Sequence, residues 1–224
     1  MNGLRAAFTL FAKECRLEFR TRELLTATVV FSLIVIVFFN FAFDPTSAEA
    51  RRFGPGLLWI AFFFAGSLMV NPSFAREQIN DTLDALRMAP IPSFAVLSAK
   101  MLANLLFLSI AEAILVPVFS VFYNVSLAGI LGRLILVIVL GTIGLVTTGT
   151  VFSAISAHAR MRELLLPVLL LPFVTPLLIA AVTTTMSLFG EAHELDRTWM
   201  IFLIGFDVVF FTTSWLLSDF LAEG

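Results

Sequence analysis

Residues 24–43 read LLTATVVFSLIVIVFFNFAF, and this stretch decides the class of fold. It contains no Lys, Arg, Asp or Glu, and an α-helix needs about 20 apolar residues to cross the hydrocarbon layer of a bilayer. The whole chain of 224 residues has the same character, since 59% of it is hydrophobic and only 13% is charged. The composition predicts a membrane protein rather than a water-soluble globule, and it gives no support to a nucleic-acid partner.

Five further intervals have the length and apolar character of a membrane span. The expected spans are residues 24–43, 53–74, 101–123, 134–157, 164–187 and 198–218. The connections between them are short and leave no room for a soluble domain. We therefore expect an all-α polytopic membrane protein whose residues 1–224 form a single transmembrane domain.

The distribution of Lys and Arg predicts the orientation of the chain. Ten basic residues fall on the side of the two termini, against four on the other side. Basic residues collect in the cytoplasm because they resist translocation. Both termini are therefore expected to be cytoplasmic, which agrees with an even number of spans.

Residues 1–23 have the pattern of an amphipathic helix. Apolar side chains recur at helical steps, while the cations fall on another face; the apolar positions are Leu4, Phe8, Phe11, Cys15 and Phe19. Such a helix lies in the membrane interface with its cations near anionic lipid headgroups. The alternative is a cytoplasmic extension of the first span.

The cytoplasmic segment 76–92 reads REQINDTLDALRMAPIP. Two ridges share helical steps, an apolar one of Ile79, Leu83 and Leu86 and an acidic one of Glu77, Asp81 and Asp84. Pro90 and Pro92 end the helix, because proline lacks the amide donor. This design suits docking on a soluble partner; the alternative is a connecting helix whose apolar side rests on the membrane.

Four stretches together resemble haem exporter protein B (CcmB), the permease-like subunit of the ABC-type cytochrome c maturation system. They are RLEFRTRELL (16–25), FGPGLLWIA (53–61), the segment 76–92 continued by FAVLSAK to Lys100, and LLLPFVTPLLIA (169–180). They are spread over nearly the whole chain in the order of the family. The resemblance implies six helices with both termini cytoplasmic, as in type-2 ABC exporters.

The resemblance also implies that segment 76–92 is a coupling helix that contacts a separate ATPase subunit. The residues that would carry this role are Glu77, Gln78, Asp81, Leu83, Leu86 and Pro90. Where the family is expected to have an Asp-Gly pair, this chain has Asn80 and Asp81, and the missing glycine favours continuous helix.

The implied complex lies in the bacterial cytoplasmic (inner) membrane and delivers haem to, or releases it from, a periplasmic chaperone. Its implied components are a second copy of this chain and subunits like CcmA (the ATPase), CcmC (a haem-handling membrane subunit), CcmD (a small accessory subunit) and CcmE (the chaperone). The sequence has no GxxxxGK[ST] loop, so ATP must be bound by the partner and the chain is not expected to be an enzyme. No covalently bound cofactor is expected, and haem is a possible cargo. Two alternatives are a generic type-2 permease for a lipid, drug or glycan, and a scaffold that passes ATPase motion to a haem-handling neighbour.

Two groups of residues are candidates for a conduit or a partner surface in the outer half of the membrane. They are Gly54, Pro55, Gly56 and Trp59 in the second span, and Pro172 and Pro176 in the fifth. Proline removes a backbone hydrogen bond, so a break or kink is expected there, facing the bundle interior or partner helices. Ordinary kinks without function are the alternative.

Four titratable residues have open roles. His193 in the outer loop is a weak candidate for a haem ligand, and His158 a weaker one. Glu112 and Asp207 lie inside spans, where an unpaired charge costs a few kcal/mol. They are either structural groups or parts of a proton relay.

Overall fold

The computed structural model describes residues 3–42, 48–79, 91–157, 159, 162–190 and 194–223. All regular secondary structure in these ranges is helical. The helices are α1 (Gly3–Thr21), α2 (Glu23–Ala42), α3 (Ala48–Val70), α4 (Pro72–Ile79), α6 (Ser93–Phe122), α7 (Leu131–Ser156), α8 (Arg162–Phe189) and α9 (Arg197–Glu223). The predicted all-α fold is confirmed.

Six stretches of the described helices are long and apolar enough to cross a membrane, as predicted. They are Glu23–Phe41, Arg52–Arg76, Ser93–Phe122, Leu131–Ser156, Leu165–Phe189 and Arg197–Ser218. The third begins at Ser93 rather than at residue 101. The helix is thus longer than the predicted span, because α6 continues through Lys100, which the structure buries.

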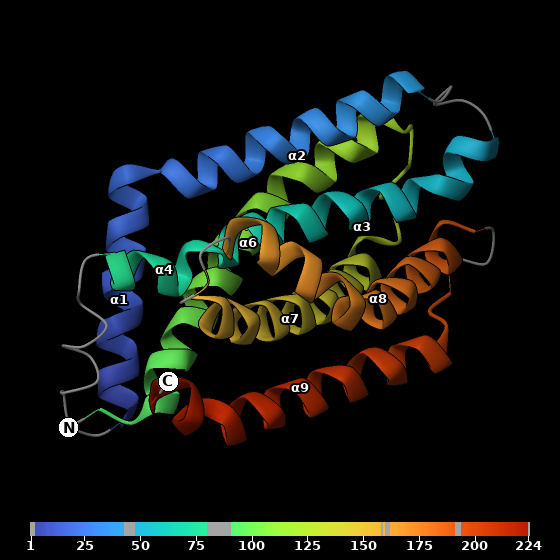
Figure 1. Cartoon of the computed structure of the whole chain (residues 1–224). Coiled ribbons are helices and arrows are strands. Elements are labelled where there is room, and N and C mark those ends of the chain that lie inside the picture. Colours follow the sequence, from blue (N-terminus) through green and yellow to red (C-terminus); the bar gives the residue numbers. More distant parts are fainter. Residues whose placement is uncertain are drawn as a thin grey trace.

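The six spanning helices lie alongside one another as one bundle (Figure 1). In the spanning windows of α3 and α7, 72% of the residues are buried, against 17% in those of α2 and α9. α7 packs against α3, α6, α8 and α9. The core therefore centres on α3 and α7, while α2 and α9 present most of their surface to the surroundings.

Glycines explain why α7 can occupy the centre. A Cβ added at Gly141 would lie 2.2 Å from the Trp59 ring of α3, and one added at Gly144 would lie 2.7 Å from a carboxylate oxygen of Asp207 on α9. Gly149 is similarly close to α3. Small residues allow helices in a membrane to approach closely and gain van der Waals contact.

α1 is a separate helix that crosses the ends of the bundle helices (Figure 1). It is separated from α2 by Arg22, whose φ of 55° lies in the left-handed region that non-glycine residues rarely adopt. The alternative of a simple extension of the first span is therefore wrong. Of the predicted apolar stripe, Phe11 and Cys15 pack against the bundle, whereas Leu4, Phe8 and Phe19 are exposed, although Phe19 also contacts the Phe107 ring of α6.

α8 contains Pro167, Pro172 and Pro176 and is nevertheless assigned as one helix from Arg162 to Phe189. α3 likewise continues through Pro55. A break or kink was expected in both helices; neither is broken, and a kink within a continuous helix stays a prediction. α1 and the C-terminal end of α9 lie at the same end of the bundle (Figure 1), as an even number of spans requires.

Candidate functional site

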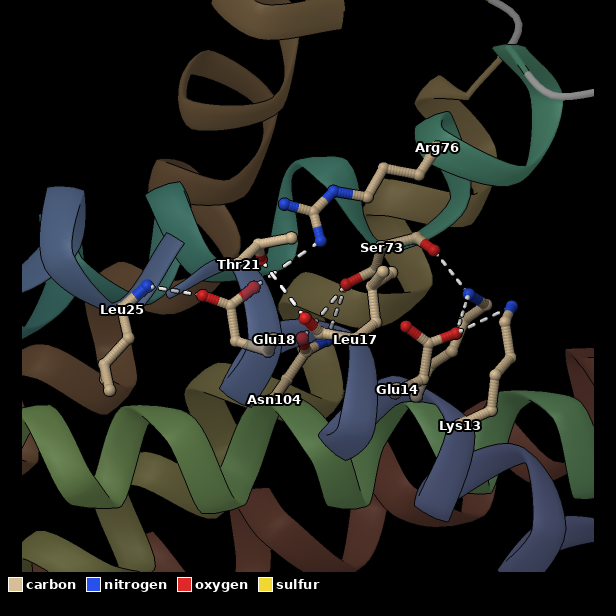
Figure 2. A network of polar contacts seen from close by, with 10 residues as sticks. Lys13, Glu14, Leu17, Glu18, Thr21, Leu25, Ser73, Arg76 and Asn104 are labelled. Atoms are coloured by element: carbon tan, nitrogen blue, oxygen red, sulfur yellow. Dashed lines mark hydrogen bonds and ion pairs between the residues drawn. The ribbon is translucent and has the colours of Figure 1, made fainter. Parts of the chain in front are cut away.

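A cluster of polar side chains joins α1, α4 and α6 at the end of the bundle where α9 ends (Figures 1 and 2). We call this cluster the polar junction. Its members are Glu14 and Glu18 of α1, Ser73 and Arg76 of α4, and Lys100 and Asn104 of α6. These polar groups lie at the start of α2 and α6, so each one that is buried must find a partner within the protein.

Glu18 ties three helices together. Its side chain is only 4% exposed. One carboxylate oxygen accepts a hydrogen bond of 2.8 Å from the backbone N–H of Leu25, in the first turn of α2. The other lies 3.5 Å from a guanidinium nitrogen of Arg76 on α4 (Figure 2). Glu18 therefore caps α2, satisfies a backbone donor that has no partner within the helix, and links the α1–α2 bend to α4.

Lys100 makes the second link between these helices. Its side chain is 4% exposed, and its ammonium nitrogen lies 3.4 Å from a carboxylate oxygen of Glu14 on α1. It also donates to the backbone carbonyl of Ser73 and lies 5.0 Å from the centre of the Phe74 ring. These contacts explain how a charged residue is tolerated inside an apolar helix, because a buried charge must be paired and hydrogen-bonded.

Asn104 carries the connection to the central helix. Its amide nitrogen donates to the hydroxyl of Thr150 on α7 at 3.1 Å, and its amide oxygen accepts from the Ser73 hydroxyl at 3.0 Å. α4 is therefore hydrogen-bonded to α6, and through α6 to α7. The junction therefore connects α1, α2, α4, α6 and α7.

The polar junction links helices and encloses little space. The junction surrounds a cavity of about 30 Å³ beside Glu18 and Arg76, which holds about one water molecule and is too small for haem. Within the described ranges, no three His, Cys, Asp or Glu side chains form a group that could hold a metal. α4 leads directly into residues 80–90, so a displacement of that segment would act on the junction.

The predicted coupling residues fall at the edge of the described structure. Glu77 and Gln78 belong to α4, next to Arg76 of the junction. Asp81, Leu83, Leu86 and Pro90 lie outside the described residues. Their docking role therefore stays a prediction, while their attachment point is defined.

The predicted outer candidates do not form one surface. Gly54, Pro55 and Trp59 are buried, and the Trp59 N–H donates to the Thr185 hydroxyl of α8 at 3.0 Å. Gly56 is partly buried, whereas Pro172 and Pro176 are exposed on α8. The expectation that these two prolines face the bundle interior is wrong, because α8 turns them outward. Their contact with partner helices stays a prediction.

Both histidines, His158 and His193, lie outside the described residues, so the haem-ligand hypothesis is untested. The junction itself was not predicted. Lys100 and Asn104 are four apart on α6, and Glu14 and Glu18 are four apart on α1. That spacing places each pair on one helix face and is the signal that could have indicated these two polar faces.

Six apolar helices with a polar junction at one end define an all-α, multi-pass membrane protein. The model of the CcmB protein family matches residues 5–220. Heme exporter protein B of Pseudomonas aeruginosa is 32% identical over 170 residues, which cover 76% of each chain. The protein of the same name from Bradyrhizobium diazoefficiens is 28% identical over 182 residues, or 81% of this chain and 82% of the relative. That from Rhodobacter capsulatus is 31% identical over 170 residues, or 76% and 78%. The chain belongs to the CcmB family.

Proposed function

We propose that this chain is the membrane permease subunit of an ABC-type complex that exports haem for cytochrome c maturation. The family match over residues 5–220 and the relatives named heme exporter protein B support this function. ATP is bound by a partner subunit and haem is the cargo. The haem is delivered to, or released from, a periplasmic chaperone.

The polar junction supports a route for the mechanical step. An ATPase subunit docks on segment 76–92 and displaces α4 when it closes on ATP. Arg76 then pulls on Glu18 at the α1–α2 bend, while Ser73 acts on Asn104 and Lys100 of α6. One docking event therefore reaches the first span and the third span together.

The proposed assembly contains two copies of this chain with their ATPase subunits, together with subunits like CcmC and CcmD and a chaperone like CcmE. The bundle end that carries the junction faces the cytoplasm of a bacterium. The excess of basic residues on that side supports this orientation. His193 then lies on the periplasmic side, and its exchange for Ala should reduce haem transfer to the chaperone; unchanged transfer would end its candidacy.

Replacing Leu83 and Leu86 by Asp tests the docking step. The double variant should insert into the membrane but lose the ATPase subunit on co-purification, because two charges interrupt the apolar ridge. Met88→Asp is the matched control, since it adds charge to the same segment off that ridge. Stoichiometric co-purification of the double variant would show that the coupling assignment is wrong.

A further inference from the structure

Glu112 lies in the middle of α6, about 18 Å along the helix axis from Lys100 at 1.5 Å per residue. It is 4% exposed. One carboxyl oxygen lies 2.7 Å from the hydroxyl oxygen of Thr142 on α7. Both residues are therefore deep in the bundle. The short contact between them requires one to donate a hydrogen bond to the other.

Thr142 has a second hydrogen-bond partner. Its hydroxyl oxygen lies 2.7 Å from the backbone carbonyl of Ile138, one turn earlier on α7. A carbonyl oxygen can only accept a hydrogen bond, and a threonine hydroxyl has one proton to donate and two lone pairs to accept with. If Thr142 donates to Ile138, the remaining contact is satisfied only when Glu112 is the donor. A carboxyl group donates only when it carries a proton.

Thr185 of α8 provides an internal comparison. Its hydroxyl lies 2.7 Å from the carbonyl of Ala181, one turn earlier, and 3.0 Å from the indole nitrogen of Trp59. An indole N–H can only donate. Thr185 therefore donates along its own helix and accepts from the neighbouring one. Thr142 has the same two kinds of contact, one to the carbonyl a turn earlier and one to a neighbouring helix. Glu112 therefore corresponds to Trp59, the residue that donates.

The surroundings favour the neutral carboxyl. No described residue forms an ion pair with Glu112; Lys100, twelve residues earlier on α6, pairs with Glu14, and Arg76 of α4 pairs with Glu18. The acidic group of α9 inside the membrane, Asp207, abuts Gly144, which points to the other side of α7 from Thr142. An unpaired charge at this depth costs a few kcal/mol.

We propose that Glu112 is an intramembrane proton-binding site, whose bound proton forms the hydrogen bond to Thr142 that joins α6 to the central helix α7. Glu112 is in this sense a positioning residue for α7. If a rearrangement of the spans admitted water, the carboxyl would release its proton to that water and the bond between the helices would be lost. This inference concerns the chain alone and does not depend on the identity of the cargo.

Infrared spectroscopy of the full chain in lipid nanodiscs at neutral pH tests the proposal. Side-chain ¹³C labelling of glutamate separates the Glu112 signal from that of Asp207. We expect the C=O stretch of a protonated glutamic acid, with a small shift in D₂O. It should be lost in Glu112→Gln, whose amide keeps the shape and a donor. The proposal is overturned if the difference between wild type and this variant contains the stretches of an ionised carboxylate instead.

Two variants of Thr142 give a second readout on the wild-type carboxyl and do not require Glu112→Gln to fold. Thr142→Val removes the acceptor, so the C=O stretch of the protonated acid should move to higher frequency. Thr142→Ser keeps the hydroxyl and should leave the band in place. Identical bands in the two variants would contradict the assigned hydrogen bond.

Discussion

Replacing Glu18 with Ala should destabilise the protein because this carboxylate holds the α1–α2 bend to α4. The hydrogen bond from Leu25 to the charged carboxylate contributes about 1.5–3 kcal/mol. The pair with Arg76 adds about 0.5–1 kcal/mol, near the value for exposed pairs, because the Arg76 side chain is 30% exposed. We expect the free energy of unfolding to fall by about 2–4 kcal/mol, as the sum of these terms.

Glu18→Gln separates the two contributions. The amide oxygen can still accept from Leu25, as a neutral bond worth about 0.5–1.5 kcal/mol, while the ion pair is lost. Its loss of stability should therefore lie between those of wild type and the Ala variant. Lys13→Ala is the matched control on α1, since the Lys13 side chain is 48% exposed and its pair with Glu14 contributes at most about 1 kcal/mol.

Reversible unfolding by SDS titration in mixed micelles, followed by circular dichroism, measures these differences. The expected order of stability is wild type and Lys13→Ala, then Glu18→Gln, then Glu18→Ala. The reasoning is refuted if Glu18→Ala is no less stable than Lys13→Ala, because Glu18 would then not support the bend.

Two further predictions concern the central helix and α1. Gly141→Ala should cost about 1–3 kcal/mol in the same titration, because its methyl group would overlap the Trp59 ring, whereas Gly132→Ala, which meets nothing within 4 Å, should leave stability unchanged or slightly raised. Equal effects of the two substitutions would contradict the close packing of α7. Burial, and then the nearby Glu14 charge, raise the pKa of the Cys15 thiol above its usual value; maleimide labelling should therefore increase with pH over a higher range than for a free thiol, because the thiolate reacts. Labelling that follows the profile of a free thiol would show that α1 is not docked.

The spans were predictable because the bilayer fixes both their length and their polarity. Residues 24–43 contain no charge and correspond to α2, with boundaries that differ by a residue at each end. The same criterion did not give the start of the helix that contains Lys100, because α6 continues through this charged residue. The buried charge of Lys100 is tolerated because it contacts Glu14 and Ser73, which are distant in the sequence and close only in the folded chain.

The spacing of polar residues could indicate a polar face on α1 and on α6, but the pairing of these faces with α4 could not be predicted from it, for the same reason. The cations and apolar residues of α1 indicated a helix in the interface, but the residues that fasten it are the acidic Glu14 and Glu18 on its inner side. Pro172 and Pro176 face outward and not into the bundle of this chain, since a proline's effect on its own helix does not determine which face the neighbouring helices cover; their contact with partner helices stays a prediction. Local sequence therefore predicts which residues form helices. The contacts between the helices involve residues that are distant in the sequence, so local sequence does not predict them.

The central claim is that the polar junction transmits ATPase motion to the spans. It is tested most directly by the number of ATP molecules hydrolysed per cytochrome c matured, measured for complexes that contain wild type or Glu18→Gln. The account predicts that the variant keeps the ATPase subunit bound but matures less cytochrome c per ATP, because α4 no longer pulls on the α1–α2 bend. Glu18→Gln removes the ion pair to Arg76. If complexes with this variant hydrolysed the same number of ATP molecules per cytochrome c matured as wild type, the account would be contradicted.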